Sequence, residues 1–232
     1  EANPGEINKQ KLKEFYQLGI NRLSIGFQSL EKNLLKFLSR IHSVKDCLST
    51  YNNARDVGFD NINIDMIFNI PKQTLTIWEN NLKQIINLNP DHISSYSLTV
   101  EPNTVLYNQV LNGNIRMPQQ ETDLNMFEIG RKMLFENKYL QYEISNYAKN
   151  NKECKHNLHY WNLDPYLAFG PSAHGYDGNK RWWNVASLQT YMNKIENKSS
   201  PIDGYEILCE KDKYNELIFN SLRTRKGISK KL

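Results

Sequence analysis

The sequence predicts an α/β fold built on a parallel sheet, and three observations support this prediction. Residues 62–67 are mainly apolar and rich in β-branched side chains, which is typical of a strand buried on both faces. Pro71 must end this strand, and Thr74 caps the helix that follows it. Strands and helices alternate at roughly thirty to forty residues per unit, which is the pattern of βαβ connections. A (βα) barrel that lacks its first strands fits best, with a doubly wound sheet as the alternative.

The individual elements follow from hydrophobic spacing and from helix stop signals. Strands are predicted at 22–28, from Asn61 to before Pro71, and at 92–100, and Glu1 stands where a further strand would end. Helices are predicted at 8–18, 30–40, 44–57, from Thr74 onward, and at 104–112, 119–137, 187–195 and 213–223. Residues 139–176 are expected to be rich in loops and aromatic side chains. The chain therefore divides into a strand–helix part at 1–102 and a mostly helical, loop-rich part at 103–232.

Charge and cysteine content narrow the class of protein. The formal net charge is +4, and the single basic cluster is Arg223, Arg225, Lys226, Lys230 and Lys231. A solvated helix end accounts for this cluster, so we expect no nucleic acid partner. Three widely separated cysteines indicate a reducing compartment, and the sequence has no apolar run of about 20 residues, so we expect a cytoplasmic protein without a transmembrane segment. The chain does not begin with Met and both ends resemble interrupted elements, so we expect a fragment of a longer protein.

Polar residues stand where the predicted strands end. They are Glu1, Gln28, Asp65 and Thr99, with Arg40 at the end of the helix after Gln28. In a parallel sheet the carboxyl ends of the strands meet at one edge, so these side chains would share one crevice. Carboxylates bind hydroxyl or ammonium groups and a guanidinium binds a carboxylate, so the set suits an amino acid joined to a ribose. The alternative is that each residue is a locally satisfied structural polar group.

A second group of candidate residues lies between residues 154 and 183. It contains His156, His159 and His174 among several aromatic side chains, with Trp182 and Trp183 at its end. Imidazoles bind iron and other metals, and aromatic rings line pockets for flat ligands. Cys154 with these histidines could suggest zinc, but the spacing matches no zinc-finger pattern. The alternative is that each histidine is an ordinary surface or core residue.

Several motifs resemble the radical S-adenosylmethionine (SAM) family, in the branch of oxygen-independent coproporphyrinogen III oxidase and the haem chaperone HemW. They are Glu-Ala-Asn-Pro-Gly at 1–5, Asn-Arg-Leu-Ser-Ile-Gly-Phe-Gln-Ser at 21–29, Asn-Ile-Asp at 63–65 with Pro-Lys-Gln-Thr at 71–74, and Tyr-Ser-Leu-Thr-Val-Glu-Pro at 96–102. Two further segments are similar to the HemW side of this branch. They are Tyr-Glu-Ile-Ser-Asn-Tyr-Ala at 142–148 and His-Asn-Leu-His-Tyr-Trp at 156–161, and the second is associated with haem in that group.

This resemblance implies a fold and two sets of site residues. The fold would be the last strands of a six-fold βα barrel at 1–102, followed by a HemW-like C-terminal region at 103–232. The residues at SAM-contacting positions would be Glu1, Gln28, Arg40, Asp65 and Thr99. The haem residues would be His156 as the iron ligand, Asn157, Tyr160 and Trp161 around the site, and His159 as a weaker candidate ligand.

The chain departs from the family pattern at the iron–sulfur site. The Cys-x3-Cys-x2-Cys loop that holds the family's [4Fe-4S] cluster is absent, and the spacing of Cys47, Cys154 and Cys209 cannot replace it. The glycine-rich strand end that meets the SAM amino group is absent as well. We expect both to belong to a preceding part of the parent protein. This chain by itself is then expected to bind neither the cluster nor SAM productively.

Three functions are compatible with these motifs. The first is a haem chaperone that passes haem to haem-accepting proteins, and the His-Asn-x-x-Tyr-Trp element favours it. The second is an oxygen-independent coproporphyrinogen III oxidase, which decarboxylates propionate side chains by radical chemistry. The third is an inactive remnant of a longer gene product. Assembly as a homodimer is left open by the sequence.

Overall fold

The computed structural model describes residues 1–229 of the 232 and divides into two compact units, Glu1–Glu153 and Cys154–Leu232. The first unit extends well past residue 102, where the sequence placed the end of the barrel part. Its later elements belong to it because α6 packs on α4 and because β5 pairs with β3. Lys230 and Lys231 of the basic cluster lie outside the described residues.

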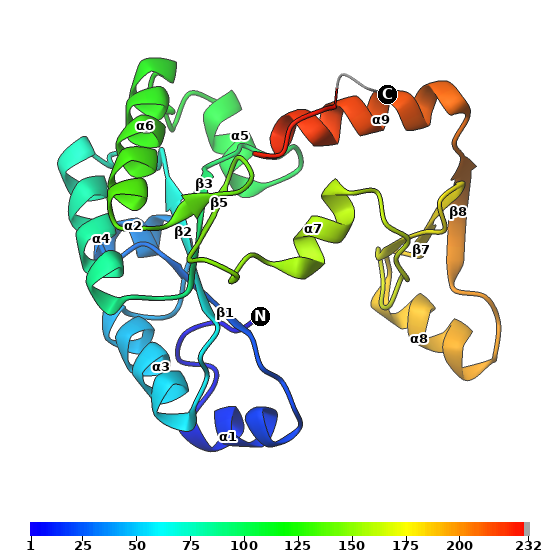
Figure 1. Cartoon of the computed structure of the whole chain (residues 1–232), viewed down its shortest axis with the longest axis horizontal. Coiled ribbons are helices and arrows are strands. Elements are labelled where there is room, and N and C mark those ends of the chain that lie inside the picture. The colour runs from blue at the N-terminus through cyan, green and yellow to red at the C-terminus, as the bar shows by residue number, and fades with distance from the viewer. Residues whose placement is uncertain (230–232) are drawn as a thin grey trace. The chain divides into compact units, whose positions relative to one another are not determined.

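The first unit contains a five-stranded sheet in the order β1-β2-β3-β5-β4 (Figure 1). Strands β1 (Leu23–Gln28), β2 (Ile62–Phe68) and β3 (His92–Ser97) run parallel, as the sequence predicts. The short strands β5 (Asn146–Ala148) and β4 (Leu140–Gln141) add two antiparallel partners at the β3 edge, and these were not predicted. At the other edge Ala2 forms an isolated parallel bridge with Ile25 of β1, in agreement with a strand end next to Glu1.

The helices of this unit lie close to their predicted positions. They are α1 (Lys9–Gln17), α2 (Lys32–Phe37), α3 (Val44–Val57), α4 (Leu75–Leu88), α5 (Val105–Leu111) and α6 (Gln120–Glu136). Local capping explains the agreement. Ser43 and Asp46 form a capping box at the start of α3, and Gly58 ends α3 in the left-handed conformation. The hydroxyl of Thr74 accepts a hydrogen bond from the Ile77 amide at the start of α4.

The two faces of the parallel strands differ in chemistry. One face carries apolar side chains such as Ile25 and Ile64, which are completely buried against α3, α4 and α6. The indole of Trp78 lies in this core and donates a hydrogen bond to the Met126 carbonyl over 2.9 Å. The opposite face is polar because the alternate residues of each strand are polar, among them Asn63 on β2 and His92 on β3. Figure 1 shows α3, α4 and α6 along one side of the sheet, and the apolar core lies between these helices and the strands.

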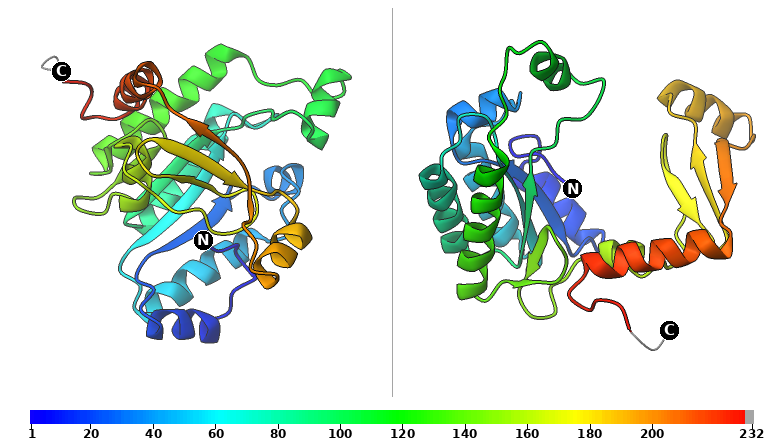
Figure 2. Two further views of the ribbon diagram at one scale, coloured as in Figure 1. Left: turned by 90° about the vertical axis from the view of Figure 1, so that its right-hand side faces the viewer. Right: turned by 90° about the horizontal axis from the view of Figure 1, so that it is seen from above.

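The second unit contains helices α7 (Lys155–Trp161), α8 (Leu188–Glu196) and α9 (Glu210–Arg223) and an antiparallel sheet. The sheet has the order β6 (His174–Tyr176), β7 (Lys180–Asn184) and β8 (Ile202–Ile207), and Figure 2 shows these strands beside one another. Helices α8 and α9 agree with the predictions, whereas the three strands and α7 were not predicted as elements. Trp182 lies over Gly175 and Trp183 lies over Gly204, where a Cβ atom would come within 2.3 and 2.6 Å of an indole. Glycine at these positions lets each indole lie flat on the neighbouring strand.

Candidate functional site

A cavity of about 450 Å³ lies in the first unit beside the polar face of β1 and β2. Four of the five residues expected to share a crevice line it: Glu1, Gln28, Arg40 and Asp65. The remaining lining residues are Ala2, Asn3, Glu6, Ile7, Lys11, Ser24 and Gly26. The parallel register explains the convergence, since Gly26 of β1 lies opposite Asp65 of β2.

Gln28 occupies an irregular position at the end of β1. The β1–β2 pairing shifts between Gly26 and Gln28, and Gln28 has a φ of 65°, which is uncommon for a residue other than glycine. Its side-chain amide lies over Gly26, which has no Cβ to exclude it. Unusual backbone conformations are often kept at ligand sites because they aim a side chain. Here the aimed group is a carboxamide, which can donate and accept hydrogen bonds.

The Asp65 carboxylate is half-buried and is held by two donors. The Ser24 hydroxyl donates to Oδ2 over 2.9 Å, and the Asn63 amide donates to Oδ1 over 2.8 Å. The Asn63 amide also donates to the Ser24 hydroxyl oxygen over 2.7 Å. Each carboxylate oxygen has a second lone pair, so Asp65 can still accept a hydrogen bond from a ligand in the cavity.

The charges around the cavity are mixed. Glu1 and Glu6 add carboxylates to that of Asp65, while Arg40 and Lys11 add cations. Such a lining suits a ligand with both an ammonium and a carboxylate group. Sequence reasoning did not single out Lys11 and Glu6, which lie in and before α1. Ser24 and Gly26 could have been found from the alternation along β1, because they share a face with Gln28.

Thr99 is not among the residues that line this cavity, so its place beside the other four residues stays a prediction. The predicted strand at 92–100 ends at Ser97, and Thr99 is an exposed residue whose hydroxyl donates to the Ser97 carbonyl over 3.4 Å. The cavity lies beside β1 and β2, while Thr99 follows β3. A contact between Thr99 and SAM therefore rests on the resemblance alone.

The second unit arranges the candidate haem residues on and near α7. His156 is exposed, and its ring lies edge-on to that of Tyr160 with the centroids 5.0 Å apart. Tyr160 in turn contacts Tyr166 at 4.5 Å, and Tyr166 contacts Tyr176 at 6.0 Å between ring centroids. The imidazole therefore stands at the end of a row of aromatic rings. An accessible imidazole is a suitable iron ligand, and aromatic rings suit the flat face of a tetrapyrrole.

The other residues of this segment have different partners. His159 is exposed, and its Nδ1 lies 2.8 Å from a carboxylate oxygen of Asp164. The ring of Trp161 is half-buried and carries the Arg223 guanidinium at 4.8 Å, which places Trp161 in the packing of α7 on α9. Asn157 is half-buried. His174, outside the six-residue segment, packs against Trp183 with the ring centroids 6.0 Å apart.

The described residues do not supply a cluster site. Among residues 1–229 no group of three or more His, Cys, Asp or Glu side chains is placed to hold a metal ion. Cys47 lies completely buried in the core, where burial raises the pKa of its thiol to about 12, so it behaves as a small apolar side chain. In the described part of the chain, no helix is long and apolar enough to cross a membrane.

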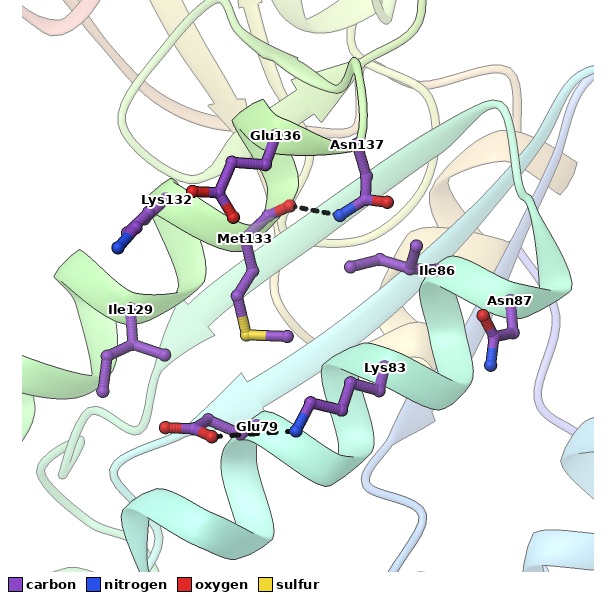
Figure 3. A pocket seen from close by; sticks show the side chains of 9 residues that line it. All are labelled: Glu79, Lys83, Ile86, Asn87, Ile129, Lys132, Met133, Glu136 and Asn137. Atoms are coloured by element: carbon purple, nitrogen blue, oxygen red, sulfur yellow. Dashed lines mark hydrogen bonds and ion pairs between the residues drawn. The ribbon is translucent and has the colours of Figure 1, made fainter.

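A second cavity, of about 590 Å³, lies between α4 and α6 (Figure 3). Figure 3 shows that Glu79 and Lys83 reach it from α4, while Lys132, Met133 and Glu136 reach it from α6. Glu79 and Lys83 pair with each other at 3.9 Å, and both are exposed enough for solvent to screen the pair. This groove runs between two helices that pack on each other, and it contains none of the residues predicted to bind a ligand.

Comparison with known proteins gives a consistent family assignment. Residues 1–85 match the family model described as Radical SAM superfamily. The whole chain is 41% identical to the heme chaperone HemW of Bacillus subtilis over 232 residues, which cover 61% of that relative. Over 175 residues it is 39% identical to the mitochondrial radical S-adenosyl methionine domain-containing protein 1 of Danio rerio, covering 75% of this chain and 39% of that relative. The chain therefore spans 61% of the length of the HemW relative, and its matched part spans 39% of the mitochondrial relative.

Among solved structures, the chain resembles the coproporphyrinogen III oxidase HemN of Escherichia coli, described as a radical SAM enzyme, with a TM-score of 0.80. The match covers 96% of this chain and 54% of that chain at 22% sequence identity, so it establishes the fold. The predicted α/β fold of radical SAM type is thereby confirmed. Together these findings identify the chain as a member of the radical SAM superfamily, similar over its full length to heme chaperones named HemW.

Proposed function

We propose that this chain is part of a haem chaperone that binds haem through its second unit and SAM beside the sheet of its first unit. The observation that carries the proposal is the exposed His156 imidazole at the end of a row of tyrosine rings. It occurs in a chain that is similar over its full length to curated heme chaperones. The implied partners are haem-accepting proteins in the cytoplasm.

On the haem side, His156 would supply the nitrogen ligand to iron. Its ring is held by the edge-on contact with Tyr160, which leaves the imidazole exposed. Haem supplies the iron and the flat macrocycle, and the aromatic row offers apolar surface for that macrocycle. Asn157 would line the site, whereas Trp161 would support it by packing α7 on α9.

On the SAM side, the first unit would bind the amino-acid and ribose parts of the ligand. Asp65 and Glu1 accept hydrogen bonds from hydroxyl or ammonium groups, and the Arg40 guanidinium pairs with a carboxylate. Gln28 can do either through its amide. A [4Fe-4S] cluster in the parent protein would need cysteine ligands from outside this chain, because the three cysteines present are not placed to hold one. The residues present would therefore bind and orient SAM, whereas its productive use, meaning reductive cleavage, would need the cluster as well.

The haem part of the proposal is tested by titrating the chain with haem and recording the Soret absorbance. We expect saturable binding that weakens by more than about tenfold in His156→Ala, because the iron loses its nitrogen ligand. The matched controls are His159→Ala and His174→Ala, which remove the other exposed histidines of the second unit. Both controls should bind haem within about twofold of the unsubstituted chain.

Two results would overturn the chaperone proposal. The first is equal haem binding by His156→Ala and the unsubstituted chain, which would remove His156 as the ligand. The second is anaerobic, SAM-dependent decarboxylation of coproporphyrinogen III by a longer form that carries the cluster, which would favour the oxidase.

A further inference from the structure

A continuous chain of hydrogen bonds crosses the polar face of the sheet and ends at Asp65. It begins at Tyr142, whose hydroxyl lies 2.8 Å from Nε2 of His92. Nδ1 of His92 lies 2.6 Å from Oδ1 of Asn63, which also accepts a hydrogen bond from the Ser94 hydroxyl over 3.2 Å. The Asn63 amide then donates to Oδ1 of Asp65 over 2.8 Å. Tyr142, His92, Ser94 and Asn63 are all buried, and Asp65 is the member that lines the cavity.

The direction of these hydrogen bonds follows from the carboxylate. An ionised carboxylate can only accept, so Asn63 must present its NH2 group to Asp65. The Asn63 oxygen then faces His92 and can only accept, so Nδ1 of His92 must carry the proton. A neutral imidazole has one protonated nitrogen, so Nε2 of His92 is an acceptor and the Tyr142 hydroxyl donates to it. Every donor from Tyr142 onward therefore points toward Asp65.

The surroundings of His92 support the neutral imidazole that this order requires. The residue is 1% exposed, and burial together with the positive charge of Arg22 lowers the pKa of its imidazole to about 3. The strand register places His92 directly opposite Asn63, so the contact is built into the β2–β3 pairing. A one-residue slip of that register would move His92 to the apolar face.

The arrangement does more than satisfy buried polar groups. Apolar side chains at these positions would avoid the cost of burying an imidazole and an amide, and so would give a simpler sheet face. What the polar residues add is a fixed orientation of one carboxylate. With Oδ1 held by Asn63 and Oδ2 held by Ser24, the Asp65 carboxylate cannot rotate freely, and its remaining lone pairs keep a constant direction.

We propose that His92 and Asn63 are positioning residues, which hold the Asp65 carboxylate in the orientation that accepts an ammonium or hydroxyl group of the ligand. This inference rests on the proposed binding of SAM by the first unit. Neither His92 nor Asn63 lines the cavity, so they act through Asp65. Their contribution is to affinity, because a preorganised acceptor loses less entropy when the ligand binds.

The first test measures the tautomer of His92 in the unsubstituted chain by ¹⁵N NMR of its imidazole. We expect a neutral ring at pH 7 with the proton on Nδ1, because Asn63 accepts from that atom. A proton on Nε2, or a charged ring, would break the order of donors and overturn the proposal. This measurement needs no ligand and no variant, so it can overturn the proposal even if a substituted chain fails to fold.

The second test compares His92→Asn with His92→Leu. The two side chains have similar size, and the asparagine amide can replace Nδ1 as the donor to Asn63 whereas leucine cannot. SAM itself is the probe, added at up to millimolar concentration and followed by chemical-shift changes of the Gln28 side-chain amide. We expect His92→Asn to bind within about twofold of the unsubstituted chain and His92→Leu to bind about five- to tenfold more weakly.

The outcomes separate this inference from the proposed function. Equal affinity of the asparagine and leucine variants, with SAM bound by the unsubstituted chain, would overturn the positioning role and leave SAM binding intact. If the unsubstituted chain gave no shift with SAM, both the SAM part of the proposed function and this inference would fall. Leucine leaves the Tyr142 hydroxyl without its acceptor, so the unfolding free energies of both variants are measured beside their SAM affinities. A purely structural role for His92 would show as a loss of stability in His92→Leu without a loss of SAM affinity in the chain that remains folded.

Discussion

The side-chain nitrogen of Gln28 lies 2.6 Å from the point where a Cβ atom on Gly26 would stand. Both residues line the cavity of the first unit, two positions apart on β1. The glycine is therefore required by the close approach of an amide from its own strand rather than by its backbone conformation. Any larger residue at position 26 must displace the Gln28 amide from the cavity wall.

We predict that Gly26→Ala separates stability from ligand affinity. The atom that must move is the end of a flexible side chain, so the free energy of unfolding should change by less than about 1 kcal/mol. The displaced amide should lower SAM affinity about threefold or more, as measured by NMR titration. In a Gln28→Ala background the same alanine should have no further effect on affinity. A threefold further loss of SAM affinity in that background would show that Gly26→Ala does not act by displacing the Gln28 amide.

Asn81 holds the segment that follows Gln28. Its side-chain oxygen accepts hydrogen bonds from the Leu30 amide over 2.6 Å and from the Ser29 hydroxyl over 3.1 Å, and the residue is completely buried. We predict that Asn81→Leu lowers the free energy of unfolding by about 2–4 kcal/mol, because buried donors lose their acceptor. The control is Asn80→Leu at the exposed neighbouring position, which should change stability by less than about 0.5 kcal/mol. Equal losses of unfolding free energy in the two variants, measured by chemical denaturation, would show that the Asn81 hydrogen bonds do not stabilise the fold.

The parts of the fold that could be predicted are those decided by local chemistry. Helix α3 was placed at its observed bounds because Ser43 and Gly58 are strong signals at its two ends. The β-branched residues of β2 predict a buried strand, and Asp65 stands out as a carboxylate that interrupts this apolar run near its carboxyl end. Parallel strands present their carboxyl ends at one edge of the sheet, and this rule predicts that Gln28 and Asp65 lie close together. The two residues do line one cavity.

The parts that could not be predicted depend on contacts between distant residues. Strand β7 pairs with β8 beyond an intervening helix, and its tryptophans pack on Gly175 and Gly204, which no local period reveals. The sequence predicts Thr99 at the end of a strand because no local signal marks the end of pairing at Ser97. The link from His92 to Asn63 depends on the β2–β3 register, which sequence reasoning did not attempt.

The buried His92 gives a specific pH dependence. Burial lowers its pKa from 6.5 to about 3, so between these values the unfolded chain binds a proton that the folded chain does not. Stability from this group is fully present above about pH 6.5 and falls as the pH falls toward 3. We predict that between pH 7 and pH 5 the unsubstituted chain loses about 2 kcal/mol more unfolding free energy than His92→Asn does. Carboxylates contribute equally to both chains, so parallel losses in urea denaturation would contradict a buried neutral imidazole.

Trp161 and His156 belong to one segment but should respond differently to substitution. Because Arg223 of α9 lies over the indole, we predict that Trp161→Leu lowers the stability of the second unit by about 1–2 kcal/mol. Amide hydrogen exchange at residues 154–229 measures this loss. The Soret maximum of bound haem should keep its wavelength in Trp161→Leu, since the iron ligand is unchanged, whereas His156→Ala should shift or abolish it.

The matched control is Arg223→Leu, which removes the cation from the indole. This substitution should cost less stability in the Trp161→Leu background than in the unsubstituted chain, and the difference, the coupling free energy of the two residues, should be about 0.5–1 kcal/mol. A shifted Soret maximum in Trp161→Leu at unchanged stability would instead place the indole against the haem.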